Sequence, residues 1–214
     1  MRSQKLPFRN ILPVIVSTAL LALHLASAHA QQAGGTPQNI NLPPVNSGAN
    51  PYKVIRDWAK LDKEGRPWGG SNGVAIDRDG KTVWATDRCS PGFIPGCLGH
   101  KGNPVHHFDA EGRELISFGG GMFVWPHGIH VDRDGNVWVT DSRTASAADL
   151  EKFPGEQNKG SVVVKFSPDG KVQMTLGKPG VRGNPPEALT DPTDVVTDPA
   201  NGDVYVAEIG RAHV

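Results

Sequence analysis

A strand–turn–strand pattern that occurs three times constrains the fold of this sequence more than any other feature. Its clearest copy runs from Gly128 to Asp141, where two alternating stretches of β-branched and aromatic residues flank the turn Arg133-Asp134-Gly135-Asn136. Glycine in that turn supplies the positive φ that a short hairpin loop needs. Matching copies run from Gly73 to Asp87 and from Asp194 to Glu208. The pattern therefore predicts three similar β-hairpins.

A second kind of hairpin follows the first and second copies. One joins Pro104–Asp109 to Arg113–Gly119, and the other joins Ser161–Phe166 to Lys171–Gly177. Two hairpins per repeat give four antiparallel strands, and radial repetition of such sheets is a β-propeller. Glycine (26) and proline (18) make up 44 of the 214 residues, which also favours a turn-rich fold. The predicted fold class is all-β, a partial propeller of about three four-stranded blades.

The first 30 residues predict a signal peptide. A basic start with Arg2, Lys5 and Arg9 precedes the apolar run 11–25, and Ala28-His29-Ala30 matches a cleavage motif. Because the apolar run is short and interrupted, we do not expect a membrane span after the signal is removed. The alternative is an N-terminal anchor that is retained. Cleavage predicts a secreted or periplasmic protein.

The mature chain is expected to start with a linker. Residues 31–50 are rich in Gln, Asn, Gly and Pro and have no hydrophobic periodicity. The propeller is predicted over residues 51–214, with a first strand at Tyr52–Ile55. The charge balance of 22 basic and 22 acidic residues gives no reason to expect nucleic acid as a partner.

The two cysteines, Cys89 and Cys97, are eight positions apart, and two Pro and two Gly lie between them. In an oxidising compartment this spacing favours a small disulfide loop. Metal binding by the pair is the alternative, although no zinc-ribbon spacing and no second pair are present. A polar insertion at Ala145–Gly160, with a helical turn expected at Ala147–Lys152, adds a second loop. Together the two loops are candidate contacts for a protein partner.

The histidines divide into two groups. His127 stands at a strand entrance in Pro126-His127-Gly128, where it is either a metal ligand or a structural cap of the strand end. His106 and His107 are neighbours in a strand, so they point to opposite faces and cannot share one metal.

The Asp-Arg-Asp-Gly turns lack the remainder of an EF-hand, so we interpret them as turn chemistry.

Three segments carry a resemblance to a known family: Ser71–Asp77, Trp125–Asp141 and Asp191–Val206. With them the chain, over about Trp68 to Glu208, resembles the NHL-repeat β-propellers. More narrowly, it resembles the catalytic domain of peptidyl-α-hydroxyglycine α-amidating lyase. The resemblance implies a six-bladed propeller with zinc and a structural calcium in its central channel. It also implies a metal-dependent lyase that releases glyoxylate from a peptidyl-α-hydroxyglycine and leaves a peptide amide.

The resemblance assigns roles to four residues of this sequence. His127 matches the first of the three zinc histidines, and Arg88 matches the catalytic arginine. Val74 and Ile129 match the two positions whose backbone carbonyls bind calcium. The remaining zinc histidines and the calcium aspartate belong to later repeats of the family.

Other positions depart from the family pattern. The family tyrosine falls near Gly210, and the cysteine pair beside it falls at Asp191 and Arg211. About three of six blades are expected, so we expect an incomplete central metal site. The chain is then a fragment, a truncated gene product, or one half of a ring that a second copy completes.

Three functions fit these observations. The first is lyase action on a peptidyl-α-hydroxyglycine or a similar small carbinol, with a peptide or small-molecule substrate. The second is a non-catalytic propeller that binds a protein through its loop face. The third is a lactonase-like hydrolase, which would hold calcium with carboxylates. No Gly-x-Ser-x-Gly elbow, P-loop or dinucleotide fingerprint occurs in the sequence.

Overall fold

A computed structural model describes residues 48–49, 51–61, 65–90, 96–184, 186–209 and 211–213. The chain divides into two units, Met1–Pro51 and Tyr52–Val214. The predicted signal peptide lies outside the described part, and so does the predicted linker except for residues 48–49. The description below therefore concerns the second unit. No helix in the described part is long and apolar enough to cross a membrane.

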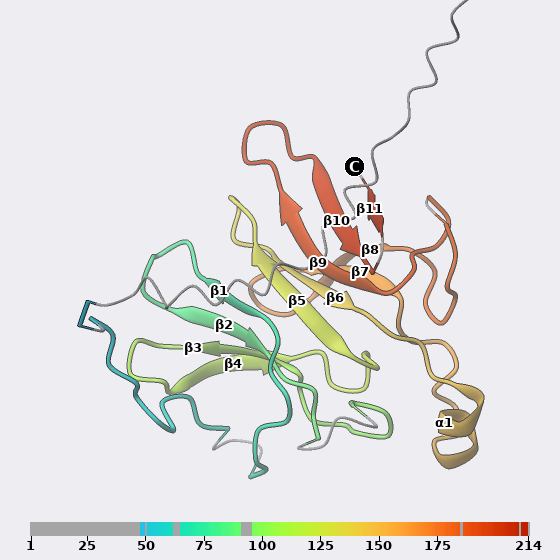
Figure 1. Ribbon diagram of the computed structural model, residues 1–214, viewed down its shortest axis with the longest axis horizontal. Coiled ribbons are helices and arrows are strands. Elements are labelled where there is room, and N and C mark those ends of the chain that lie inside the picture. Colours follow the sequence, from blue (N-terminus) through green and yellow to red (C-terminus); the bar gives the residue numbers. More distant parts are fainter. Residues whose placement is uncertain are drawn as a thin grey trace, which may run out of the picture. The chain divides into compact units, whose positions relative to one another are not determined.

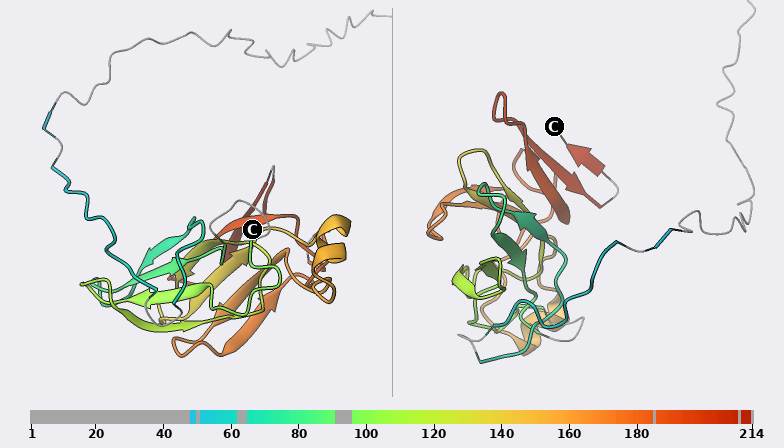
Figure 2. Two further views of the ribbon diagram at one scale, coloured as in Figure 1. Left: turned by 90° about the horizontal axis from the view of Figure 1, so that it is seen from below. Right: turned by 90° about the vertical axis from the view of Figure 1, so that its left-hand side faces the viewer.

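Three antiparallel sheets follow one another along the second unit (Figure 1). The first holds β1 (Val74–Ile76), β2 (Val83–Thr86), β3 (Val105–Phe108) and β4 (Glu114–Phe118), in that spatial order. The second holds β5 (Pro126–Val131), β6 (Val137–Asp141), β7 (Val162–Phe166) and β8 (Val172–Leu176). The third holds β9 (Pro192–Thr197), β10 (Val204–Glu208) and β11 (Arg211–His213). A short helix, α1 (Ala147–Lys152), lies outside the sheets (Figures 1 and 2).

The predicted hairpins are confirmed. The three copies of the repeat form β1–β2, β5–β6 and β9–β10, and the second kind of hairpin forms β3–β4 and β7–β8. The fold is an all-β propeller, as the sequence predicts, and its described part has two four-stranded sheets and one three-stranded sheet. The helical turn expected in the insertion is α1.

The strand predicted at Tyr52–Ile55 is wrong. The structure gives this segment no strand, and the side chains of Tyr52, Val54 and Ile55 are 82%, 75% and 65% exposed. A strand needs a neighbour for its backbone hydrogen bonds, and β1 pairs with β2 alone among the described strands. β-propensity without a partner strand is therefore insufficient here.

Aspartates at the end of the first strand of each hairpin organise the turns. Asp132 Oδ1 accepts hydrogen bonds from the backbone N–H groups of Asp134 (2.9 Å) and Asn136 (2.8 Å), and its Oδ2 accepts one from Trp138 Nε1 (3.0 Å). Burial opposes ionisation of Asp132, but these hydrogen bonds outweigh it and lower its pKa to about 2. In the first repeat, Trp84 Nε1 donates to Asp77 in the same way, at 2.6 Å. The turns use their carboxylates internally, in agreement with the predicted turn chemistry.

The core lies between successive sheets. The largest cluster joins Trp84, Val105 and Phe118 of the first sheet to Ile129, Val137, Val139, Val162, Val164 and Phe166 of the second. A second cluster joins Trp138 and Val163 of the second sheet to Val195 and Val206 of the third. Burial of these side chains at about 25 cal/mol per Å² is what holds one blade on the next.

The segment before β1 covers part of the far face of the first sheet. Leu61, with Trp58 and Trp68 beside it, packs on Ala85 and Phe108. The indole Nε1 of Trp58 donates to the carbonyl of Ala110 at 3.2 Å, which fixes the segment to the β3–β4 turn. This segment packs on the face of the first sheet opposite to the face on which the second sheet packs.

His106 and His107 face opposite sides of β3, as predicted. His106 is buried on the covered face, where its Nδ1 lies 2.6 Å from Glu114 Oε1. His107 stacks on Trp84 on the other face, with ring centroids 4.0 Å apart.

β5, the first strand of the second sheet, lies next to both β1 and β9, the first strands of the other two sheets. Two glycines permit this approach. A Cβ on Gly73 would lie 2.5 Å from the carbonyl oxygen of His127, and a Cβ on Gly128 would lie 2.7 Å from the carbonyl oxygen of Thr193. The glycine at the start of the repeat is therefore a packing requirement between neighbouring inner strands.

We expect Gly73→Ala to lower the free energy of unfolding by about 1–3 kcal/mol, because the added methyl group forces β1 and β5 apart. Gly70→Ala is the matched control, since its Cβ would lie 3.6 Å from the nearest atom, an ordinary contact. Urea denaturation of both variants measures the difference. Equal stabilities of the two variants would contradict this account of the repeat glycine.

Candidate functional site

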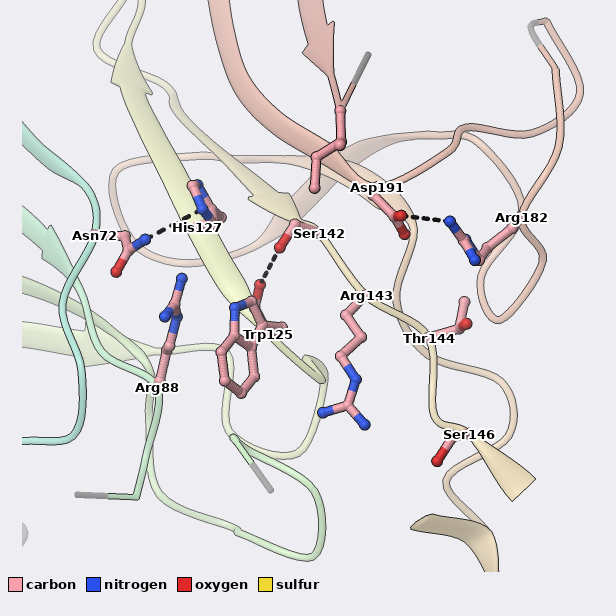
Figure 3. A pocket seen from close by; sticks show the side chains of 11 residues that line it. Asn72, Arg88, Trp125, His127, Ser142, Arg143, Thr144, Ser146, Arg182 and Asp191 are labelled. Carbon is pink, nitrogen blue, oxygen red and sulfur yellow. Dashed lines mark hydrogen bonds and ion pairs between the residues drawn. The ribbon is translucent and has the colours of Figure 1, made fainter. Parts of the chain in front are cut away.

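A cavity of about 670 Å³ opens where β2 and β6 end and β5 begins (Figure 3). Its lining comes from segments of all three repeats and includes Asn72, Arg88, Trp125, His127, Arg143 and Arg182. The resemblance had singled out two of these side chains, Arg88 and His127, and the fold brings them to the same cavity. Both predicted site residues therefore share one candidate pocket.

Arg88 follows directly after the end of β2 and is only 8% exposed. Its guanidinium lies over the Trp125 ring, with Cζ 4.2 Å from the ring centroid, and its Nε donates to the carbonyl of Pro126 at 3.4 Å. Burial lowers the pKa of Arg88 from its ordinary value. An arginine starts from a pKa above 12, so it remains a cation at neutral pH.

Arg88 differs from the two other arginines of the pocket in its partners. Arg143 forms an ion pair with Asp149, and Arg182 forms one with Asp191. Over the described residues, no carboxylate pairs with Arg88. The two nitrogens at the end of its guanidinium are therefore the positive charge that an anionic ligand would meet in this pocket.

His127 is held from both sides by the neighbouring repeats. Its Nδ1 lies 2.8 Å from the carbonyl oxygen of Thr193, which only accepts, so Nδ1 carries the proton. Its Nε2 is 3.1 Å from the amide nitrogen of Asn72 and accepts that hydrogen bond. Burial lowers the pKa of His127, the contact with Thr193 raises it, and the charge of Arg88 lowers it further, with a net decrease. The ring is therefore neutral at pH 7, with the lone pair of Nε2 on the side of Asn72 and the pocket.

This ring arrangement is also the one that a metal-bound histidine adopts, with a backbone carbonyl fixing the tautomer. A zinc centre needs at least two further ligands of this kind. Among the residues that the structure describes, no three His, Cys, Asp or Glu side chains come together in a way that could hold a metal ion. The described part of the chain therefore does not by itself form the three-histidine centre that the resemblance implies.

The predicted calcium positions, Val74 and Ile129, line a second cavity of about 360 Å³ between the inner strands. Asp194, from the third repeat, lines the same cavity. The fold thus brings both residues to one axial cavity, and calcium binding there stays a prediction.

The Trp125 segment is fixed by a buried carboxylate. Asp141, at the end of β6, accepts hydrogen bonds from the backbone N–H groups of Val124 (2.8 Å) and Trp125 (2.6 Å). It is fully buried, and this burial raises its pKa to about 7, against the effect of the two donors. The floor of the pocket therefore depends on a carboxylate that titrates near neutral pH.

The predicted disulfide between Cys89 and Cys97 is confirmed, with Cα atoms 4.9 Å apart. Residues 91–95 of its loop lie outside the described residues. The insertion after β6 is ordered by Asp149, which pairs with Arg143 and accepts from the backbone N–H of Ser146 at 2.9 Å. Phe153 of the same insertion packs against the cluster that contains Trp125. The insertion therefore borders the pocket, to which it contributes Ser146, whereas the described part of the disulfide loop contributes no lining residue.

Of the eleven residues that line the pocket, only Arg88 and His127 were singled out as site residues from the sequence, and Asn72 and Trp125 are the two missed residues that contact them. Asn72 precedes Gly73 just as His127 precedes Gly128. The alignment of the repeats could therefore have indicated that Asn72 occupies the position equivalent to His127. Trp125 could have been noticed as the aromatic residue before Pro126, although its contact with Arg88 joins two sheets and has no local signal.

Comparisons with known proteins agree with this fold. The family model described as NHL repeat matches residues 123–146. Peptidyl-glycine alpha-amidating monooxygenase A of Xenopus laevis is 31% identical over 143 residues, which are 64% of this chain and 14% of that protein. Peptidyl-alpha-hydroxyglycine alpha-amidating lyase 2 of Drosophila melanogaster is 24% identical over 181 residues, which are 78% of this chain and 40% of that protein.

A solved structure, the nidogen/laminin complex, aligns with a TM-score of 0.42 and 22% identity over 66% of this chain and 41% of that chain. The chain spans less than half the length of the two curated relatives. Residues 123–146 form an NHL repeat, and the predicted resemblance to NHL-repeat propellers is confirmed.

The raised pKa of Asp141 predicts a pH-dependent stability. An acid whose pKa is higher in the folded state stabilises the fold below its unfolded pKa of about 4, and this contribution is lost as pH rises through about 7. We expect the free energy of unfolding of the wild type, minus that of Asp141→Asn, to decrease by up to about 4 kcal/mol over this range. Denaturation at several pH values measures it. A constant difference would contradict the assignment.

Proposed function

We propose that the pocket of Arg88 and His127 binds the carboxylate end of a peptidyl-α-hydroxyglycine and cleaves its C–N bond. The observation that carries this proposal is the guanidinium of Arg88, which is buried on Trp125 and has no carboxylate partner among the described residues. The amidating lyases among the relatives support the same class of substrate. We also propose that the chain acts after export, which the predicted signal peptide and the disulfide support.

Arg88 serves as the anchor in this scheme. Its Nε is occupied by Pro126, so the two terminal nitrogens are available for the two oxygens of a substrate carboxylate. The indole of Trp125 holds the guanidinium plane through a cation–π contact, which is worth about 2 kcal/mol where water is excluded. The charge of Arg88 lowers the pKa of His127, so the two side chains are close enough to act on one bound substrate.

His127 serves as the proton acceptor. Its neutral Nε2 accepts the proton of the carbinol hydroxyl, after the amide of Asn72 has moved from the position it now occupies. The carbinol C–O bond becomes the carbonyl of glyoxylate, and the electron pair of the C–N bond passes to the amide nitrogen. The imidazolium then returns its proton to that nitrogen. The products are glyoxylate and a peptide amide, and no proton or electron is gained or lost.

The first test is the affinity for the carboxylate. We expect Arg88→Lys to raise KM for a peptide that ends in α-hydroxyglycine by about 10- to 100-fold, because a lost charge-assisted hydrogen bond costs about 1.5–3 kcal/mol. Arg113→Lys, an exposed arginine on the β3–β4 hairpin, is the matched control. Glyoxylate release measures both, in parallel assays with and without added Zn²⁺ and Ca²⁺, so that a metal requirement does not hide the effect. Absence of glyoxylate from the wild type would contradict the lyase proposal and favour a binding propeller.

The second test is the pH profile. Since the folded environment lowers the pKa of His127, we expect the rate to stay constant as pH falls to 6.5 and to decline only below it. Arg88→Gln removes one cause of the lowering, so its midpoint should move to higher pH. The pH dependence of kcat/KM for both proteins measures this shift. A midpoint that does not respond to Arg88 would exclude His127 as the titrating group.

A further inference from the structure

We infer that the Cys89–Cys97 disulfide positions the guanidinium of Arg88 and thereby sets the affinity of the pocket for a carboxylate. This inference rests on the proposed role of Arg88 in binding the substrate carboxylate. It goes beyond that role because it assigns a contribution to binding to a bridge that does not line the pocket.

One end of the bridge controls the backbone beside Arg88. Cys89 follows Arg88 directly and has φ of 62°, in the left-handed region that is unfavourable for a residue with a side chain. The backbone N–H of Arg88 donates to the carbonyl of Gly70 at 2.9 Å, so the chain enters this turn from a fixed position. The left-handed residue then redirects the chain immediately after Arg88. A covalent tie on the Cys89 side chain holds that unfavourable turn in place.

The other end of the bridge is attached to the segment that carries Trp125. The backbone N–H of Cys97 donates to the carbonyl of Val124 at 2.9 Å. Gly96 packs so closely on the same segment that a Cβ there would lie 2.6 Å from the Trp125 ring. The disulfide thus ties the backbone of Arg88 to the backbone of the residue on which its guanidinium stacks.

These contacts form a closed circuit. It runs from Arg88 through Cys89 and Cys97 to Val124 and Trp125, and it returns to Arg88 through the cation–π contact of 4.2 Å. Both sulfur-bearing residues are buried, at 3% and 2% exposure. If the bridge is removed, the direct Arg88 contacts across this junction are the stack on Trp125 and the long hydrogen bond of 3.4 Å to Pro126.

The sheets themselves do not depend on this bridge. The β1–β2–β3–β4 and β5–β6–β7–β8 ladders are complete without it, and the core cluster between the two sheets contains neither cysteine. We therefore expect loss of the disulfide to release Arg88 while the blades stay packed. This separates a positioning role from a role in overall stability.

The test is a double-mutant cycle on glyoxylate binding, measured by ligand-observed NMR so that weak affinities can be read. The four proteins are the wild type, Arg88→Ala, the pair Cys89→Ser and Cys97→Ser, and the triple variant. We expect the paired serine variant to raise Kd for glyoxylate about tenfold or more. In the Arg88→Ala background, the same serine substitutions should change Kd by less than about twofold, because the group that they position is absent.

A second measurement guards against misfolding of the serine variant. Dithiothreitol, which carries no carboxylate and is removed before the measurement, converts the bridge of the wild type to two thiols and is itself oxidised to its cyclic disulfide. Its effect on Kd should match that of the serine pair, and circular dichroism should stay unchanged.

The outcomes separate this inference from the proposed function. Equal Kd values with and without the disulfide would overturn the positioning role alone. Equal losses in both Arg88 backgrounds would show a general structural role and would also overturn it. Failure of the oxidised wild type to bind glyoxylate would overturn both the inference and the carboxylate site.

Discussion

The fold and the pocket both depend on one interaction that recurs in each repeat. A buried carboxylate at the end of the second strand accepts backbone N–H groups from the segment that leads into the first strand of its own sheet. The three instances are Asp87 with Gly69 (2.6 Å), Asp141 with Val124 and Trp125 (2.8 and 2.6 Å), and Glu208 with Thr190 (2.5 Å). These segments have no strand partner for those donors, and an unsatisfied buried N–H costs about 1–3 kcal/mol. The carboxylate therefore fixes the backbone of the segment that leads into each blade.

The same interaction determines which residues reach the pocket. Arg88 follows Asp87, Ser142 follows Asp141 and Ile209 follows Glu208, and all three line the cavity. Because each carboxylate fixes the same point of its repeat, the residue after it always emerges at the same end of the blade. The repeats can thus differ in chemistry at one position while their backbones stay alike. A positive charge, a hydroxyl and an apolar side chain occur at equivalent places for this reason.

Local features of the sequence were sufficient to predict the hairpins. The alternation of side chains, the Asp-Arg-Asp-Gly turns and the recurring Trp84 and Trp138 all act within one repeat, and their hydrogen bonds span at most a few residues. The wrong strand at Tyr52–Ile55 has the right composition but no neighbouring strand. The composition of a segment indicates whether it is able to form a strand. Whether the strand forms depends on a neighbouring strand with which its backbone can pair.

The candidate site could be predicted only in part, because its contacts run between repeats. The resemblance indicated Arg88 and His127, but the groups that orient them come from other copies: Asn72 from the first, Thr193 from the third and Trp125 from the second. The sequence separations of these contacts, 55 residues for Asn72 and 66 for Thr193, carry no local signal. The packing of β5 against both β1 and β9 brings them together.

The burial of Arg88 costs free energy that its contact with Trp125 offsets only in part. Removal of a guanidinium from water costs several kcal/mol, and the contact with Trp125 returns about 2 kcal/mol of it. Arg66, Arg143 and Arg182 each have a carboxylate that offsets this cost. For Arg88 no such carboxylate is found in the described part of the chain, and this is why we propose an anion from solution as its partner. A site that leaves one charge uncompensated in its resting state is selective for a ligand that carries the opposite charge.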